Sequence, residues 1–326
     1  DAYHHKSPPC LIKCDMKKII LLFVILFLLF ALSHPALTLT GASNGLMIWF
    51  EKLLPTLLPF LIAVNLLQNA DIFTSALRFF PRAGSVMAIL AAALPGFLFG
   101  LPVGAKLTAD FTEKGLLTQK AGNLLLICCN QLSPAFVGSY VMIQCLNSPD
   151  LIPVSYLLLY LPPAIPVVIL LARPALAKDN PSPAAADRIT TKKASRFQTL
   201  FQIIDASILN GFETIAKLGG YLIFFGILCQ YLENLLPLSQ TANGCVMMLM
   251  EVTSGIHYFS GSALPFFPKY LLCMTALSFG GLCTHAQTFS VISGAPLSKR
   301  RYVVAKTVFA LITLLLSFGA LTILSR

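Results

Sequence analysis

The chain has 326 residues, of which 56% are hydrophobic and only 11% are charged. Soluble domains usually carry about 25% charged residues. The apolar residues form runs along the whole chain, so one buried segment does not explain the shortfall. This composition excludes a disordered chain, a secreted disulfide scaffold and an ordinary cytosolic enzyme, and it leaves a polytopic membrane protein.

The basic residues are concentrated between the apolar runs. The formal net charge is +10, from 23 Lys and Arg against 13 Asp and Glu. In a soluble protein this excess would suggest nucleic-acid binding, but basic residues beside membrane helices mark cytoplasmic loops. We therefore predict the lipid bilayer, and no nucleic acid, as a partner of this chain.

No set of residues predicts a metal site, a cofactor or an enzyme. Most of the nine cysteines lie within apolar runs, where a free cysteine behaves as a small hydrophobic residue. Cys283 and His285 have no evident further ligands, whereas structural metal sites usually have four. The sequence also lacks a Walker loop and a zinc-protease motif.

The N-terminal region begins with a segment that matches no structural element. We expect residues 1–15 to be a non-native or disordered extension, because Met16-Lys17-Lys18 followed by an apolar run is typical of a natural start. The run from 19 to 32 fits either a cleaved signal peptide or a retained first helix. A retained helix over 18–39 is favoured, because apolar residues resume after a short gap.

Eight further apolar intervals follow, and a basic segment divides them. They cover 44–68, 84–101, 119–145, 151–172, 200–232, 242–260, 269–294 and 303–324. The basic segment, 173–198, is predicted to be a cytoplasmic loop. It separates a first membrane half, 16–172, in which 44–172 forms a repeat unit, from a second half, 199–326.

The basic clusters also constrain how the chain crosses the membrane. They place the N-terminus, the 173–198 loop and the segment before the last helix on the cytoplasmic side. These placements agree only if 84–118 and 242–260 each enter and leave the membrane on one side. We therefore predict two re-entrant hairpins.

Short motifs recur in the same order in the two halves. Asn44-Gly45 with Glu51 recurs as Asn210-Gly211 with Glu213, and Asn130-Gln131 as His285-Ala286-Gln287. The predicted fold class is all-α: a polytopic membrane helix bundle with two inverted-topology repeats and re-entrant hairpins. Broken elements that meet at a repeat interface are typical of transporters.

The first hairpin is the most unusual stretch, because Pro and Gly leave backbone groups that lipid cannot satisfy. Gly104 allows a tight approach and Lys106 adds a positive charge, which favours one side of a substrate site. The alternative is a structural tip whose lysine reaches the headgroups.

Polar residues interrupt the interval 119–145. Asn130, Gln131 and Ser133 precede Pro134, and a helix unwound there would offer polar groups to a ligand. The alternative is hydrogen bonding between helices, which polar membrane residues commonly provide.

The second half holds the sharpest candidate. Glu251 lies in an apolar interval, where a carboxylate costs about 3 kcal/mol to insert, and Thr253 and Ser254 follow it. We expect Glu251 to contact an ion, a proton or a substrate. His285 and Gln287 also interrupt an apolar run, and His285 is either a proton acceptor or a neutral hydrogen-bond donor.

Glu213 and Lys217 are four residues apart, so they share a helix face and are expected to pair. We interpret this pair as mainly structural.

At these motifs the sequence resembles the YlbJ-type sporulation integral membrane proteins. The first half carries Gly100-Leu101-Pro102-Val103-Gly104-Ala105-Lys106-Leu107, and the second half carries Glu251-Val252-Thr253-Ser254-Gly255 and Phe279-Gly280-Gly281-Leu282 with His285-Ala286-Gln287. The resemblance covers residues 17 to 324 apart from the basic loop. Members of that family tend to have a Ser- and Asn-rich stretch where this chain has residues 130–134.

The resemblance implies membership of the Gate, or nucleoside-recognition, group, which includes the spore maturation proteins A and B. It implies a plasma-membrane protein of endospore formation, needed for the spore cortex. Our preferred hypothesis is a transporter-like protein for an unidentified small solute or ion. The alternatives are a non-transporting scaffold that binds cortex-assembly proteins, and a nucleoside permease.

Overall fold

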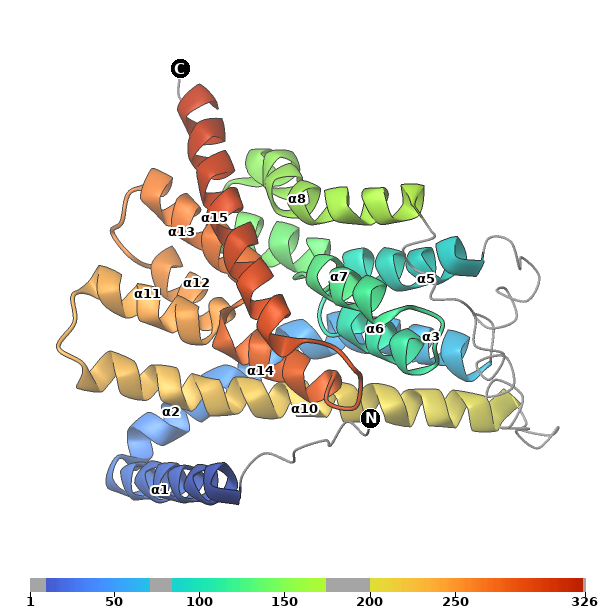
Figure 1. The fold of residues 1–326 in the computed structure, drawn as a ribbon. Helices are drawn as coiled ribbons and strands as arrows, with labels where there is room; N and C mark the ends of the chain where they lie inside the picture. The colour runs from blue at the N-terminus through green and yellow to red at the C-terminus, as the bar shows by residue number, and fades with distance from the viewer. Residues whose placement is uncertain (1–9, 71–83, 174–199, 325–326) are drawn as a thin grey trace.

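The computed structural model describes residues 10–70, 84–173 and 200–324, and all regular elements in these ranges are helical (Figure 1). Four helices there are long and apolar enough to cross a membrane, and a bent helix pair near the N-terminus gives a fifth candidate span. The chain is therefore an integral membrane protein, and the all-α helix bundle expected from its composition is confirmed.

The N-terminal helices bend sharply. α1 (Cys10–Ser33) ends one residue before α2 (Pro35–Met47), and the axis turns by 105° there. The first helix therefore stops before residue 39, because a residue that precedes proline is disfavoured in helical geometry whereas proline suits a helix start. α1 also includes residues 10–15 of the segment that was expected to lie outside the fold, and residues 1–9 lie outside the described ranges.

The helix that was expected over 44–68 begins earlier than predicted. α2 continues through the π-helical segment η1 (Ile48–Leu53) into α3 (Leu54–Asn69), so one bent rod covers residues 35–69.

Two helical hairpins occupy the intervals that were predicted to be re-entrant. The first joins α5 (Gly84–Phe99) to α6 (Val103–Glu113), and the second joins α11 (Gln240–Met250) to α12 (Val252–Ser260). The four helices have 16, 11, 11 and 9 residues, so each is about 14–24 Å long, less than the roughly 30 Å of the hydrocarbon core. These elements are therefore too short to cross the membrane singly, as expected for re-entrant hairpins.

Each hairpin is followed by a broken span and a long helix. α7 (Gln119–Cys129) is interrupted before η3 (Phe136–Cys145), and a short helix, η4 (Pro149–Leu151), leads to α8 (Ile152–Ala172). In the second half α13 (Phe266–Phe279) and α14 (Gly281–Val291) precede α15 (Lys299–Leu324). The break at Gly280 has a φ of 95°, which glycine adopts without strain.

The two halves therefore share one order of elements. The rod from α2 to α3 in the first half corresponds to α10 (Leu200–Leu235) in the second, and each is followed by a hairpin, a broken span and a long helix. This order agrees with the recurring motifs. The opposite orientation of the halves across the membrane stays a prediction, and the 173–198 loop lies outside the described residues beyond Arg173.

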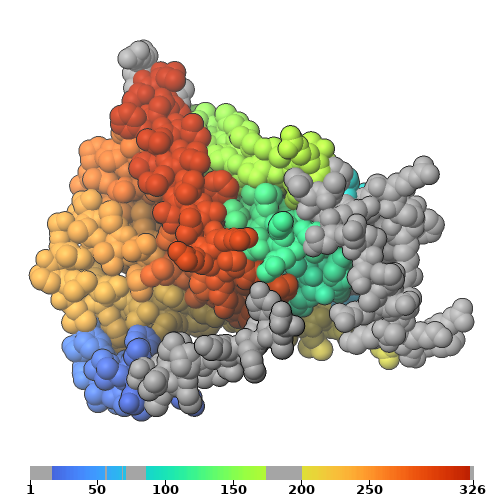
Figure 2. Space-filling model, in the orientation of Figure 1, coloured from blue at the N-terminus to red at the C-terminus, as the bar shows by residue number. Residues whose placement is uncertain are grey.

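Close packing of glycines joins α2 to α10, which cross in Figure 1. A Cβ atom added to Gly45 would lie 2.5 Å from the Leu222 carbonyl oxygen, and one added to Gly226 would lie 2.6 Å from that of Gly41. Small residues four apart let membrane helices approach this closely. α15 packs on α7, α8 and α13, and Figure 2 shows it lying across the face between the two halves.

Candidate functional site

In each half the hairpin tip packs against the break in the following span. The Leu101 amide donates to the Gln131 carbonyl oxygen at 2.8 Å, and a Cβ on Gly100 would lie 2.6 Å from the Ser133 nitrogen. In the second half, a Cβ on Gly281 would lie 3.1 Å from the Met248 carbonyl oxygen. Each hairpin tip therefore packs where the helix of the following span is interrupted.

Two tyrosines of α8 donate hydrogen bonds to the backbone around the break after α7. The Tyr160 hydroxyl donates to the Leu132 carbonyl oxygen at 2.7 Å, and the Tyr156 hydroxyl donates to that of Pro134 at 2.7 Å. The first bond gives a partner to a backbone oxygen within the break, and the second ties the start of the next helix to α8.

A central cavity of about 50 Å³ lies between the two tips. Its polar lining combines Ser133 of the first half with Glu251, Thr253, Thr284 and Gln287 of the second. Its apolar lining is Leu53, Leu57, Leu101, Leu132, Phe136, Leu218, Leu222 and Val252. This volume holds a few water molecules or one small ion.

Glu251 is the ionisable side chain of the central cavity. It is 1% exposed and caps α12, because its two carboxylate oxygens accept from the Thr253 nitrogen at 2.9 Å and the Ser254 nitrogen at 2.5 Å. The positive end of the helix dipole also stabilises a negative charge there. Within the described residues no cationic side chain forms an ion pair with Glu251. The carboxylate is thus held in place while its charge lacks a cationic partner.

Two larger cavities flank the central one. The first cavity, about 270 Å³, is lined by Lys106, Asp110, Asn210, Glu213, Lys217, Tyr221 and Gln287 among others. The second cavity, about 570 Å³, is lined by Asn44, Glu51, Lys52, Gln144, Gln230, Glu233, Ser254 and His257 among others. Gln287 and Leu218 line both the first and the central cavity.

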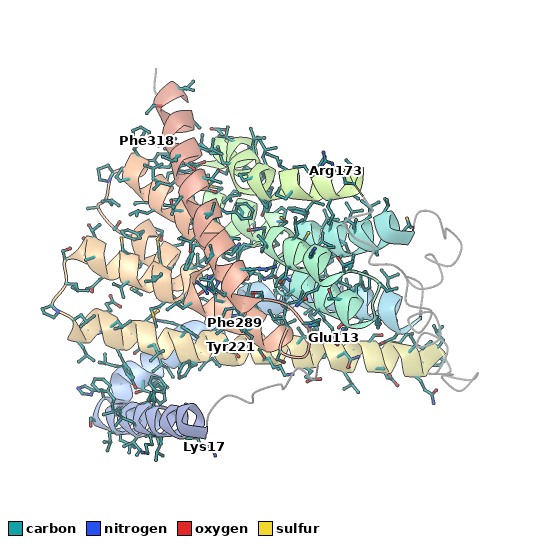
Figure 3. The ribbon with its side chains drawn as sticks, in the orientation of Figure 1. Lys17, Glu113, Arg173, Tyr221, Phe289 and Phe318 are labelled. Carbon is teal, nitrogen blue, oxygen red and sulfur yellow. The ribbon has the colours of Figure 1, made fainter. Side chains whose placement is uncertain are left out.

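The three cavities follow one another along α10. Positions 210 to 221 line the first cavity, 218 and 222 the central one, and 230 and 233 the second. Tyr221, labelled in Figure 3, therefore sits near the junction of the first and central cavities. The rod from α2 to α3 runs the other way, since positions 44–52 line the second cavity and 53 and 57 the central one.

Lys106 lies in the first cavity and is fixed by a buried amide. Its Nζ atom donates to the Asn65 Oδ1 atom at 2.7 Å, and the Asn65 amide donates to the Ser207 carbonyl oxygen at 3.3 Å. Lys106 therefore faces the cavity rather than the headgroups. Gly104 lines none of these three cavities, and a Cβ there would lie 2.3 Å from the Cys129 carbonyl oxygen, so it serves close packing.

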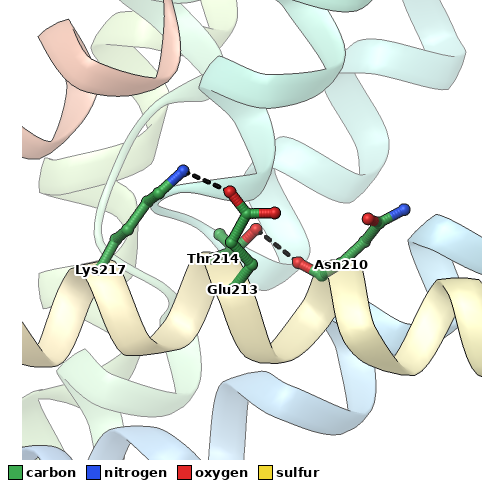
Figure 4. Close-up of polar contacts among 4 residues, drawn as sticks. All are labelled: Asn210, Glu213, Thr214 and Lys217. Carbon is green, nitrogen blue, oxygen red and sulfur yellow. Dashed lines mark hydrogen bonds and ion pairs between the residues drawn. The ribbon is translucent and has the colours of Figure 1, made fainter.

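The expected pair of Glu213 and Lys217 is confirmed, with its charged atoms 2.6 Å apart on α10 (Figure 4). The side chains are 65% and 62% exposed, so the pair borders the first cavity rather than lying inside the bundle. Exposed pairs of this kind contribute little stability. Thr214 in the same view donates to the Asn210 carbonyl oxygen at 2.8 Å.

The remaining predicted residues form a second polar cluster outside the wall of the central cavity. The Asn130 amide donates to the Thr288 hydroxyl at 2.8 Å and to the Tyr302 hydroxyl at 3.0 Å, and His285 is 3% exposed. Gln131 accepts from Lys306 at 2.6 Å. The interpretation as helix-to-helix hydrogen bonding thus describes Asn130 and Gln131, whereas Ser133 and Gln287 reach the central cavity.

Several polar residues of these sites were missed at the level of sequence, among them Asn65, Thr284, Thr288, Tyr302 and Lys306. Asn65 and Lys306 each interrupt an apolar run, and this alone marks an intramembrane polar residue as a candidate. Thr288 and Tyr302 carry no comparable signal, because hydroxyl groups are common in membrane helices.

Replacing Asn130 with alanine is expected to lower the free energy of unfolding by about 1–3 kcal/mol, because two buried hydroxyl groups lose a hydrogen-bond donor. Thermal unfolding of the purified chain in detergent measures this. Asn234→Ala is the matched control, since that exposed amide donates only to the Gln230 carbonyl oxygen on its own helix. Equal effects of the two substitutions on thermal unfolding would contradict a structural role for the second polar cluster.

Paired hairpins, broken spans and a polar centre place the chain in a class: integral membrane proteins with discontinuous helices. The chain is 23% identical to the sporulation integral membrane protein YlbJ of Bacillus subtilis (strain 168), over 90% of this chain and 80% of that protein. The resemblance noted from the motifs is thereby confirmed. No family model and no solved structure matches the chain, and the wider grouping with nucleoside-recognition proteins stays a prediction.

Proposed function

We propose that the chain is a transporter-like protein of the bacterial plasma membrane that acts in endospore formation and is needed for the cortex. It would move a small solute or ion and would not be an enzyme. The arrangement of three cavities along α10 carries this proposal, because the narrow central one lies between both hairpin tips. The printed name of the Bacillus subtilis relative supports the link to sporulation.

The polar centre suits alternating access. A transported solute needs a site near the middle of the membrane with a closable route on each side. The central cavity has Glu251 and three further polar side chains from the second half, while two larger polar cavities lie beyond it. Small shifts of a hairpin against its neighbouring broken span would connect the centre to one side at a time.

The recurring motifs support inverted halves. Asn44 and Glu51 line the second cavity, whereas their counterparts Asn210 and Glu213 line the first. Equivalent residues at opposite ends of one route are expected when two repeats have opposite topology. With the N-terminus and the 173–198 loop in the cytoplasm, α10 starts inside, so the first cavity would open to the cytoplasm and the second to the exterior.

Cysteine labelling tests to which side of the membrane each of the two larger cavities opens. A membrane-impermeant maleimide is expected to label Gln230→Cys only from the exterior and Asn210→Cys only from the cytoplasmic side, above the labelling of the unsubstituted chain. Leu222→Cys, at the centre, should react slowly from both sides. Leu315→Cys, at a position 72% exposed on an apolar helix, is the lipid-facing control and should stay unlabelled.

Positions 104 and 255 are unsuitable for such probes, because a Cβ there would lie 2.3 and 2.4 Å from backbone atoms. Labelling of positions 210 and 230 from the same side would overturn the inverted arrangement. A central cysteine that reacts from neither side, in a chain that otherwise supports sporulation, would favour the scaffold for cortex assembly.

A further inference from the structure

A lysine is buried in the last helix. Lys306 is 1% exposed and lies on α15, two turns past its start at Lys299. Lysine is almost never fully buried unless it is paired, because removing an ammonium from water is costly. Yet its hydrogen-bond partner is a neutral group, the Gln131 side-chain oxygen at 2.6 Å.

Gln131 connects this lysine to the end of a broken helix. Its amide nitrogen donates to the carbonyl oxygens of Ile127 at 3.2 Å and Cys128 at 3.3 Å, in the last turn of α7. The C-terminal end of a helix carries a partial negative charge. A positive charge on Lys306 therefore strengthens the link between α15 and the break, and a neutral amine weakens it.

A second base lies on the same side of α15 as this lysine. His285 of α14 is 3% exposed, and neither ring nitrogen has a hydrogen-bond partner. Its ring packs against those of Phe279 and Tyr302, with centroids 4.7 and 5.4 Å away. Tyr302 lies four residues before Lys306 on α15, so the two share a helix face and His285 packs beside that face. Two positive charges in this buried place would repel each other.

The helices packed against α15 are α7, α8 and α13, and they carry further titratable groups. α7 contributes the thiol of Cys128, a residue whose carbonyl oxygen accepts from Gln131. The Tyr160 hydroxyl of α8 is bonded to the Leu132 carbonyl oxygen, and the Tyr302 hydroxyl of α15 accepts from Asn130. α13 contributes Lys269, bonded to the Ser262 carbonyl oxygen, Tyr270, bonded to Ser155, and Cys273. Among the residues that the structure describes, no carboxylate is hydrogen-bonded to Lys306 or His285.

Lys306 and His285 lie next to the central cavity but do not line it. Thr284 and Gln287, which flank His285 on α14, line the central cavity, as do Leu132 and Ser133 after Gln131. A change in charge on the pair would therefore reach the cavity through α14 on one side and through the α7 break on the other.

We infer that Lys306 and His285 form an internal proton-binding site that holds one exchangeable proton and couples solute movement to proton movement. This rests on the proposed transporter function. With the proton on the Lys306 Nζ atom, the α7 break is tied to α15. Transfer of that proton to a His285 ring nitrogen, and from there to water in an opened cavity, leaves a neutral amine and releases Gln131. The reverse transfer restores the link.

The test is a comparison of proton binding by the purified full-length chain and its Lys306→Met variant. Potentiometric titration in detergent, from about pH 6 to 9, is expected to show about one more proton bound per chain in the parent than in the variant at the lower end of this range. Lys299→Met removes an exposed lysine from the same helix. It should leave the proton count in this range unchanged, because an ordinary lysine titrates near 10.4.

Two further variants separate proton binding from stability. Lys306→Arg keeps the positive charge permanently, so it should also lose the exchangeable proton without losing the charge. His285→Asn combined with Lys306→Met should lose the same single proton and not two, if the two bases share it. Each variant is first checked for an unchanged elution volume and thermal unfolding within a few degrees of the parent.

A parent and a Lys306→Met variant with the same proton count over this range would overturn the proposal. So would loss of two protons in the double variant, which would mean that the bases titrate independently. These outcomes are distinct from failure of the transport proposal, which depends on the sidedness of labelling at positions 210 and 230. If positions 210 and 230 are labelled from opposite sides but the extra proton is absent, the transport proposal stands and the proton coupling is wrong.

Discussion

Replacing Gly104 with alanine is expected to separate the first hairpin from α7 and to destabilise the chain by about 3 kcal/mol, the upper end for overpacking. The added methyl group would lie 2.3 Å from the Cys129 carbonyl oxygen and 2.8 Å from its carbonyl carbon. Both are backbone atoms, so no side-chain rotation relieves the clash. Thermal unfolding in detergent and the amount of protein in the membrane measure the effect.

Gly220→Ala is the matched control for this substitution. Gly220 lies inside α10, and a Cβ there has no atom within 4 Å apart from its own helix and neighbours. Alanine is favoured over glycine in a helix by up to about 1 kcal/mol, so this variant should be unchanged or more stable. A Gly104→Ala chain as stable as the Gly220→Ala chain would show that the hairpin does not pack on α7 as described.

Replacing Glu251 with glutamine is expected to abolish heat-resistant spores in the native host while the protein remains in the membrane at its normal level. Glutamine keeps a side-chain oxygen that accepts from one of the capped amides, Thr253 or Ser254, but it has no charge. Loss of spores with normal abundance would assign the function to the charge in the central cavity. Normal spore yield would contradict a role for Glu251 in solute or ion contact.

Glu251→Ala separates the cap from the charge. It removes both acceptors at the start of α12, and loss of such a cap costs about 1 kcal/mol, so this variant should unfold earlier than Glu251→Gln. Glu113→Gln is the surface control, because this exposed carboxylate at the end of α6 lines none of the three cavities (Figure 3). It should alter neither stability nor spore yield.

The sequence was sufficient for the elements that depend on local chemistry. Glycine and proline mark the tip near Gly100 and the break at Gly280, where the backbone has positive φ values of 70° and 95°. Apolar length predicts the long helices, and an isolated carboxylate in an apolar run identifies Glu251. Each of these follows from rules that act within a few residues.

The rest depends on contacts between distant parts of the chain. Lys306 and its partner Gln131 are 175 positions apart, and the two residues that receive the Asn130 amide are 158 and 172 positions away. Because no local pattern specifies such pairs, the sequence could not show that Asn130 and His285 lie outside the cavity wall whereas Gln287 lies on it. The sharp bend before Pro35 follows from a local rule instead, and it was missed because hydropathy alone favoured a continuous helix.

The tyrosine bonds at the α7 break have a consequence for hydration. An interrupted helix in a membrane needs partners for the backbone groups that it frees, and ordered water is a common one. Here the Tyr160 hydroxyl takes the place of that water at the Leu132 carbonyl oxygen, and the Tyr156 hydroxyl holds the start of the next helix at Pro134 against α8. The interruption therefore persists whether the neighbouring cavity is wet or dry, and the route can fill and empty without rebuilding the helix at each step.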